Sequence, residues 1–304
     1  MRAATPHDDL DRGSPMTRTV CLAGVLIALL AAPTVAQNPA WSTPTKPFKV
    51  IDNTYYVGTQ GIASYLIATP EGDILIDVGL PQNAALVEAN IKSLGRRLTD
   101  VKFILVSHGH FDHAGGLAKL KADTGAVVVA GIGERYALQK GVYVGSESDK
   151  QLDFPPVTLD GEIADGQVIS LGGAHLTAHL TPGHTKGCTT WTWPVKDADG
   201  SAHTAIYFCS GSVAANRLVP EQYPGIVADY RATFPKARAL QGDVFLAPHT
   251  EFFEMEAKRA KLAKPGPNPF IDRAGYLKLL NDQQAAFESA LAAAQAKAKN
   301  QAMP

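Results

Sequence analysis

The sequence predicts an α/β fold built in layers, and three observations support this prediction. Short apolar runs rich in β-branched and aromatic residues, such as residues 101–106, are typical of buried strands. Stretches with apolar residues on one face, such as residues 82–94, are typical of helices. The two patterns alternate along the first half of the chain, which indicates helices packed against a sheet.

The predicted elements of the first half follow one another closely. An irregular arm rich in proline and threonine precedes four strands, at residues 49–51, 54–58, 63–68 and 74–79. The helix at residues 82–94 ends near Gly95. Strands and helices then alternate, with strands at residues 101–106 and 126–130 and helices at residues 117–121 and 134–140.

The second half is richer in strands. Residues 141–156 lack periodicity and form a predicted surface loop whose apolar tip, Phe154-Pro155-Pro156, could close over a bound substrate. Strands are predicted after this loop at residues 167–171, 174–180, 189–193, 205–209 and 243–247. A helix at residues 229–240 turns Tyr230, Phe234 and Ala237 inward, and a second helix occupies residues 276–302.

Size and charge limit the possible functions. A chain of 304 residues with 45% hydrophobic content can bury a sizeable core and fits one large domain or two small ones. The formal net charge of −1, without a long basic run, gives no reason to expect a nucleic-acid partner.

Residues 1–36 are predicted to form a secretory signal peptide. Its positive end is Thr17-Arg18-Thr19. The apolar run that follows, residues 20–31, is too short for a typical membrane-spanning helix. Thr34-Val35-Ala36 supplies the small residues of a cleavage site. Cleavage is expected after Ala36, and translation is expected to start at Met16. The mature chain, residues 37–304, is then a single domain in the periplasm.

Two cysteines remain in the mature chain, Cys188 and Cys209. An exported protein can pair them, but nothing in the sequence shows that they lie within bonding distance. Both states stay open, and free buried thiols are the favoured interpretation.

One short loop holds an unusual density of metal-ligand side chains. His108, His110, Asp112 and His113 fall within six consecutive positions, directly after the strand predicted at residues 101–106. The ends of strands are where α/β folds place their chemistry, and imidazole with carboxylate suits zinc. The first two histidines can share one ion, while the adjacent Asp112 and His113 can hold a second ion, as in two-metal hydrolases. The alternative is a polar loop whose histidines are merely hydrogen-bonded.

Three residues outside this loop are candidates for the same site. His184 lies in a tight turn forced by Pro182 and Gly183, and as a third ligand of the first ion it would complete a catalytic zinc pattern. His249 follows the strand at residues 243–247 and is assigned to the second ion. Asp77 could orient a metal-bound histidine or simply cap a turn, and both interpretations stay open.

These motifs together resemble a known family. His108-Gly109-His110-Phe111-Asp112-His113, with Pro182-Gly183-His184-Thr185 and Pro248-His249, resembles the metallo-β-lactamase superfamily, and is similar above all to its subclass B3 zinc β-lactamases. The resemblance spans about residues 41–249 and implies a four-layer αβ/βα sandwich with two Zn²⁺. It implies that His108, His110 and His184 hold the first zinc and that Asp112, His113 and His249 hold the second.

The resemblance also bears on the substrate. Many superfamily hydrolases that act on thioesters, lactones or phosphodiesters carry a metal-bridging aspartate where this chain has Ser210. Serine at this position is similar to subclass B3, and the resemblance implies that Ser210 and Ser212 bind the substrate. Ser212 matches a residue that helps to bind the substrate carboxylate. The resemblance therefore implies hydrolysis of small-molecule β-lactams (penicillins, cephalosporins and carbapenems) by a hydroxide that the two zinc ions supply and Asp112 orients.

Two alternatives remain beside β-lactam hydrolysis. The first is another hydrolase of the same fold, a lactonase or a thioesterase, against which the missing bridging carboxylate argues. The second is a zinc-binding protein without catalysis, against which the open coordination positions argue. We expect a monomer that acts on its small-molecule substrate without a nucleic-acid or membrane partner.

Overall fold

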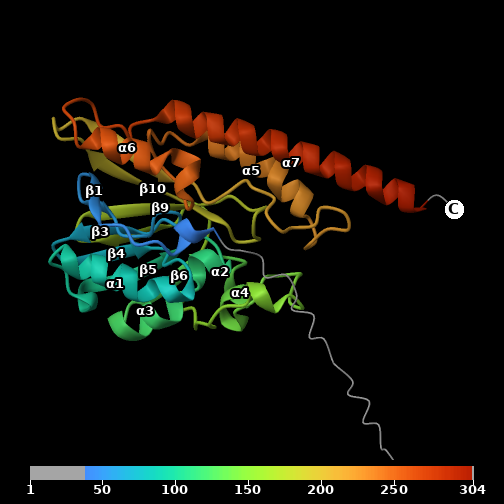
Figure 1. Cartoon of the computed structure of the whole chain (residues 1–304), viewed down its shortest axis with the longest axis horizontal. Helices are drawn as coiled ribbons and strands as arrows, with labels where there is room; N and C mark the ends of the chain where they lie inside the picture. The colour runs from blue at the N-terminus through green and yellow to red at the C-terminus, as the bar shows by residue number, and fades with distance from the viewer. Residues whose placement is uncertain (1–37, 303–304) are drawn as a thin grey trace, which may run out of the picture. The chain divides into compact units, whose positions relative to one another are not determined.

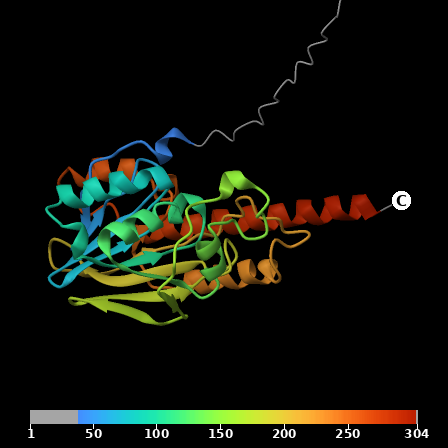
Figure 2. The same cartoon turned by 90° about the horizontal axis from the view of Figure 1, so that it is seen from below.

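Two β-sheets face one another in the structure, a computed structural model that describes residues 38–302. These residues belong to one compact unit, Gln37–Pro304. Helices α1 (Ala84–Ser93) and α3 (Leu117–Thr124) cover the outer face of one sheet. Helices α5 (Ile226–Ala239), α6 (Met255–Leu262) and α7 (Arg273–Ala302) cover the outer face of the other (Figure 1 and Figure 2). The predicted αβ/βα sandwich is therefore confirmed.

The first sheet joins a hairpin region to a parallel region. Its seven strands lie in sequence order: β1 (Phe48–Ile51), β2 (Thr54–Tyr56), β3 (Tyr65–Thr69), β4 (Gly72–Ile76), β5 (Val101–Val106), β6 (Val127–Gly131) and β7 (Gly161–Ile163). The first four strands pair antiparallel, and the strands from β4 to β7 pair parallel. Parallel pairs need crossover connections, which α1 and α3 supply. The parallel strands therefore end at the same edge of the sheet.

The second sheet is mostly antiparallel. Its order is β12-β11-β10-β9-β8, made from β8 (Val168–Leu171), β9 (Ala174–Leu180), β10 (Thr189–Lys196), β11 (Ala202–Tyr207) and β12 (Val244–Leu246). Only β11 and β12 pair parallel, and α5 (Ile226–Ala239) lies between them in the chain. Tyr230, Phe234 and Ala237 are buried on α5, as their spacing predicts. Helices α6 (Met255–Leu262) and α7 (Arg273–Ala302) follow.

The largest hydrophobic cluster draws on both sheets. Tyr65 and Leu105 of the first sheet and Trp191 and Trp193 of the second are all buried in it. The Trp193 indole donates to Thr54 Oγ1 at 3.1 Å, which adds a polar link between the sheets. A second cluster fills the space between the first sheet and its helices. A site at the edge of this sandwich therefore sits on a rigid support.

The structure differs from the sequence prediction in short or buried segments. The one-turn helix α2 (Phe111–Ala114) and the three-residue β7 were not predicted, because they are too short to give a clear periodic signal. The helix predicted at residues 134–140 is present as α4 (Arg135–Lys140). Phe154, expected at an exposed loop tip, is buried in the cluster beneath the first sheet. Its apolar ring is stabilised there by removal from water.

Cys188 and Cys209 form a disulfide, so the favoured interpretation as free thiols is wrong. Cys188 directly precedes β10 and Cys209 lies just beyond β11, and the antiparallel pairing of these strands brings their Cα atoms to 5.9 Å. This separation is ordinary for a disulfide. The sequence could not show it, because the register of the two strands depends on the whole sheet.

Replacing both cysteines, Cys188→Ala with Cys209→Ala, is expected to lower the free energy of unfolding by about 3 kcal/mol, because the bond closes a loop with a sequence separation of 21. Urea unfolding of both proteins measures the difference. Reductant should bring the wild-type protein to the stability of the double variant and leave the variant unchanged. Equal stability of the two oxidised proteins would contradict the prediction.

The predicted signal peptide, residues 1–36, lies outside the described residues. Among the helices within residues 38–302, none combines the length and the apolar character that crossing a membrane requires.

Candidate metal centre

Six side chains from three segments of the chain meet at one edge of the sandwich. His108 and His110 follow β5, and Asp112 and His113 lie on α2, the short helix that continues this loop. His184 lies in the turn between β9 and β10, and His249 lies in the loop after β12. The structure thus brings together all six residues that the sequence singled out as metal ligands.

His108, His110 and His184 form the first group. Their candidate ligand atoms all lie within 4.8 Å of one another, and all three side chains are buried. The Nε2 atoms of His108 and His184 are 3.2 Å apart. Two ligands of a tetrahedral zinc ion, each bonded at about 2.0–2.1 Å, lie about 3.3 Å apart, so this spacing fits zinc.

Asp112, His113 and His249 form the second group. Asp112 Oδ2 lies 3.2 Å from His113 Nε2 and 3.3 Å from His249 Nε2, and these two nitrogen atoms are 3.3 Å apart. All three distances fit a shared tetrahedral ion in the same way. His108 also lies within 4.8 Å of the ligand atoms of Asp112 and His113, so the two groups adjoin.

Burial sets the protonation of the first group. It lowers the pKa of His108 and of His110 well below the ordinary value, with help from the neighbouring histidines, and it lowers the pKa of His184 to about 4. At neutral pH these imidazoles therefore keep a free lone pair. A metal ion needs that neutral form of a histidine ligand.

The second group contains the negative charge of the site. Burial acts to raise the pKa of Asp112, but His113 and His249 outweigh it and hold that pKa well below its ordinary value. Burial acts to lower the pKa of His113, but Asp112 outweighs it and raises that pKa. The ionised carboxylate of Asp112 therefore offers an anionic ligand, whose charge a bound cation would balance.

Neighbouring groups orient the imidazoles. His184 Nδ1 donates to the carbonyl oxygen of Ser212 at 2.8 Å, which leaves its Nε2 lone pair for the first group. Asp77 Oδ2 lies 3.7 Å from His113 Nδ1 and accepts from Ser107 Oγ at 2.6 Å, and this hydroxyl also contacts His108 Nδ1 at 2.9 Å. This arrangement favours the orienting interpretation of Asp77 over a mere turn cap.

The two serines predicted to bind substrate occupy different positions. Ser212 lines the cleft beside the metal-ligand side chains. Ser210 is buried, and its hydroxyl lies 3.1 Å from the hydroxyl of Ser212. Ser210 therefore faces Ser212, which in turn faces the cleft.

The cleft over the two groups has a volume of about 280 Å³. Further residues that line it were not predicted from the sequence as part of the site, among them Trp41, Phe111, Tyr143, Leu152, Glu251 and Phe252. Tyr143 stacks on His110 with ring centroids 4.1 Å apart, and Trp41 packs on His249 at 5.3 Å. Tyr143 and Leu152 belong to the loop at residues 141–156, which was expected to cover a substrate.

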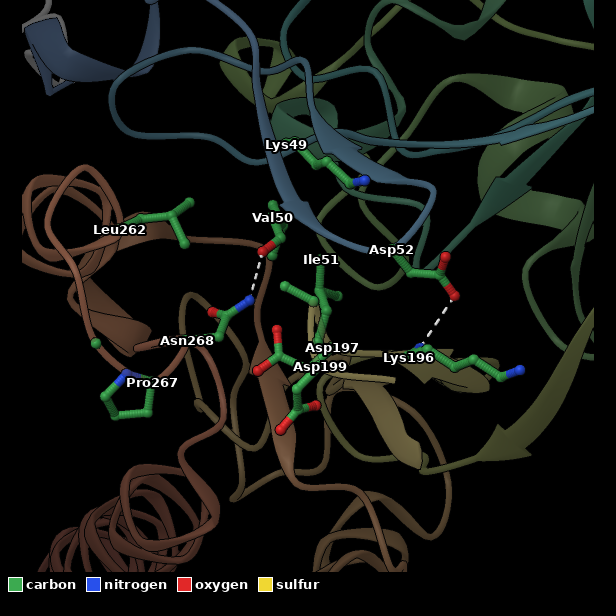
Figure 3. A pocket seen from close by; sticks show the side chains of 12 residues that line it. Lys49, Val50, Ile51, Asp52, Lys196, Asp197, Asp199, Leu262, Pro267 and Asn268 are labelled. Carbon is green, nitrogen blue, oxygen red and sulfur yellow. Dashed lines mark hydrogen bonds between the residues drawn. The ribbon is translucent and has the colours of Figure 1, made fainter. Parts of the chain in front are cut away.

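A larger cleft of about 760 Å³ lies elsewhere (Figure 3). It is formed by the β1–β2 turn, the end of β10 and the loop before α7, and its charged side chains have both signs. No side chain of either metal-ligand group lines it. Within residues 38–302, both groups of side chains that could hold a metal ion contain residues that line the first cleft instead.

Known proteins with similar sequences and structures include metal-dependent hydrolases. A family described as "Metallo-beta-lactamase superfamily" matches residues 57–249. A hydroxyacylglutathione hydrolase of Rhodopseudomonas palustris (strain HaA2) is 27% identical over 201 residues, which cover 66% of this chain and 67% of that protein.

Two solved structures share the whole fold. BJP-1, a subclass B3 metallo-beta-lactamase of Bradyrhizobium japonicum, superposes with a TM-score of 0.83 at 45% identity, covering 85% of this chain and 98% of that chain. The native FEZ-1 metallo-beta-lactamase from Legionella gormanii superposes with a TM-score of 0.80 at 36% identity, covering 84% of this chain and 98% of that chain.

Proposed function

This chain belongs to the metallo-beta-lactamase superfamily and, within it, to subclass B3, and on that premise we propose that it hydrolyses the amide bond of β-lactams. The observation that supports the proposal most is the convergence of six metal-ligand side chains beneath one cleft. Penicillins, cephalosporins and carbapenems are the proposed substrates.

We propose two Zn²⁺ as cofactors. His108, His110 and His184 would hold the first ion, and Asp112, His113 and His249 would hold the second. The donor set supports this choice, because imidazole and carboxylate at these spacings suit zinc. When bound, zinc supplies Lewis acidity, which lowers the pKa of a water molecule and polarises a carbonyl oxygen.

The residues of the chain would orient the reactants. Asp112 lines the cleft with an ionised carboxylate, which can accept a hydrogen bond from the attacking water and fix its direction. The hydroxyl of Ser212 can donate to the carboxylate that these β-lactams carry. Trp41 and Phe252 offer apolar walls to the rest of the substrate.

A covalent mechanism through Ser212 is disfavoured. Its hydroxyl lies 3.3 Å from His184 Nδ1, but that nitrogen donates its proton to the carbonyl oxygen of the same residue. A ring nitrogen that carries a proton cannot accept another from a serine nucleophile. Direct attack by water is therefore the proposed route.

Thioester hydrolysis is the second candidate. The sequence similarity to the Rhodopseudomonas hydroxyacylglutathione hydrolase, whose name describes a thioester hydrolase, favours it. Ser210 argues against it, because many thioester hydrolases of the superfamily have a metal-bridging aspartate there. The higher identity to the subclass B3 structure, 45% against 27%, also favours the β-lactam.

A substrate panel on zinc-loaded protein distinguishes these candidates. We expect kcat/KM of about 10⁴ M⁻¹s⁻¹ or more for at least one of a penicillin, nitrocefin and a carbapenem. A hydroxyacylglutathione thioester and an acyl-homoserine lactone should be turned over far more slowly. Rapid thioester or lactone hydrolysis with every β-lactam left intact would refute the proposal.

We further propose that the protein acts as a monomer in the periplasm. The signal-like pattern of residues 17–36 supports export, and the small net charge of −1 gives no sign of a nucleic-acid partner. Cell fractionation and size-exclusion chromatography measure both properties. Retention of the full chain in the cytoplasm would contradict the proposed location.

A further inference from the structure

Glu134 is a buried carboxylate to which the proposed chemistry gives no role. It lies just beyond β6, directly before α4, and its relative exposure is only 1%. Because β6 pairs in parallel with β5, the chain after β6 emerges at the same edge as the loop with His108 and His110. The fold thus places Glu134 behind the metal centre.

Glu134 contacts both loops that supply the first metal-ligand group. Its Oε2 accepts from the N–H of Gly109 at 2.8 Å, and Gly109 lies between His108 and His110. Its Oε1 accepts from the N–H of Gly187 at 2.9 Å and from the hydroxyl of Thr185, the residue after His184. One carboxylate therefore links two loops that are far apart in the sequence.

The two glycines allow this close approach. A Cβ atom added to Gly109 would lie 2.7 Å from Glu134 Oε2, and one added to Gly187 would lie 2.8 Å from Glu134 Cγ. Both distances are shorter than normal contacts, so a side chain at either position would displace the carboxylate or the loop. The absence of a side chain at both glycines therefore leaves the space that Glu134 occupies.

A buried carboxylate is costly without compensation. In the part of the chain that the structure describes, no lysine, arginine or histidine forms an ion pair with Glu134 (the nearby Lys186 pairs with Asp229 instead). The compensation comes from the three donors of the two ligand loops. The interaction that stabilises the carboxylate is thus the same one that fixes the loops.

We propose that Glu134 is a positioning residue that holds His108, His110 and His184 in convergence before a metal ion binds. This inference rests on the proposed metal-dependent hydrolysis and assigns a residue to its support. Without Glu134, each ion that binds must also order the two loops, which weakens binding. The effect reaches the metal through the two loops, because the hydrogen bonds of Glu134 go to Gly109, Gly187 and Thr185.

Glu134→Gln tests the role with almost no change in volume. The amide oxygen of glutamine can still accept from Thr185 and Gly187, but its NH₂ group faces the N–H of Gly109 and cannot accept from it. The link to the loop of His108 and His110 is then lost. We expect the affinity for zinc to fall about 10-fold or more, as for other residues that orient metal ligands. We expect kcat to fall, with KM changed little.

The affinity is measured by competition with a chromophoric chelator, and the ligand geometry by the visible spectrum of the cobalt-substituted protein. Glu162→Gln is the matched control, because Glu162 is an exposed carboxylate that pairs with Arg135, the residue directly after Glu134. It should bind zinc like the wild type. If Glu134→Gln does not fold, Thr185→Val removes a single donor and is measured in the same way, with a smaller loss expected.

Zinc affinity within twofold of the wild type, with an unchanged cobalt spectrum, would overturn the inference even if the melting temperature fell. The chelator competition needs no substrate, so the inference and the proposed function can fail separately. A wild-type protein that binds zinc but leaves β-lactams intact would contradict only the proposed function. A wild-type protein that binds no zinc would overturn both.

Discussion

Asp112→Asn is expected to reduce the kcat of β-lactam hydrolysis by about 10²–10⁴-fold, the usual range for a lost proton acceptor. The substitution keeps the volume of the side chain but removes the carboxylate that lies 3.2 Å from His113 Nε2 and 3.3 Å from His249 Nε2. The second metal-ligand group then has no negative charge, and the attacking water loses its acceptor. Little unfolding is expected, because the side chain lines a cleft rather than a core.

Nitrocefin turnover, zinc content and the far-ultraviolet circular dichroism spectrum together measure this prediction. Asp123→Asn is the matched control, since Asp123 is a carboxylate on α3 that pairs with Lys119 away from the site. It should retain wild-type turnover. A folded Asp112→Asn variant with near-normal turnover would refute the role of Asp112, as would an equal loss in the control.

Removal of the metal is expected to abolish turnover and to lower the stability of the fold. Without a cation, the Nε2 atoms of His108 and His184 face each other at 3.2 Å in a buried site. An ion that binds only the folded state at about 1,000 times its dissociation constant contributes about 4.1 kcal/mol. Chelated protein should therefore melt at a lower temperature and lose its activity together with its zinc.

Adding zinc back should restore both properties, and adding magnesium should restore neither, because the imidazole-rich donor set does not suit magnesium. Turnover and melting temperature are measured before chelation, after chelation and after addition of each metal. Chelated protein that still hydrolyses nitrocefin at the original rate, with no metal detected by mass spectrometry, would contradict the prediction.

The loop from His108 to His113 was predictable because its ligands are neighbours in the sequence and follow an unmistakable buried strand. The turn with His184 was predictable because proline and glycine restrict the backbone there. His249 was placed from the end of a strand, although only the tertiary fold brings that strand beside the others. The layered fold followed from the alternation of strands and helices.

Other features depend on long-range contacts without a sequence pattern. The Cys188–Cys209 bond requires the register of β10 against β11, which depends on the whole sheet. Glu134 reaches the ligand loops mainly through backbone N–H groups, which every non-proline residue has. Tyr143 lies in a loop without periodicity, so its stacking on His110 has no local signal.

Anomalous X-ray diffraction at the zinc absorption edge, on crystals of the zinc-loaded protein, tests the central claim most directly. The account predicts two peaks in this site. One should lie about 2.0–2.1 Å from nitrogen atoms of His108, His110 and His184, and the other at bonding distance from Asp112, His113 and His249. No peak at this edge of the sandwich, or His184 or His249 turned away from the other ligands, would contradict it.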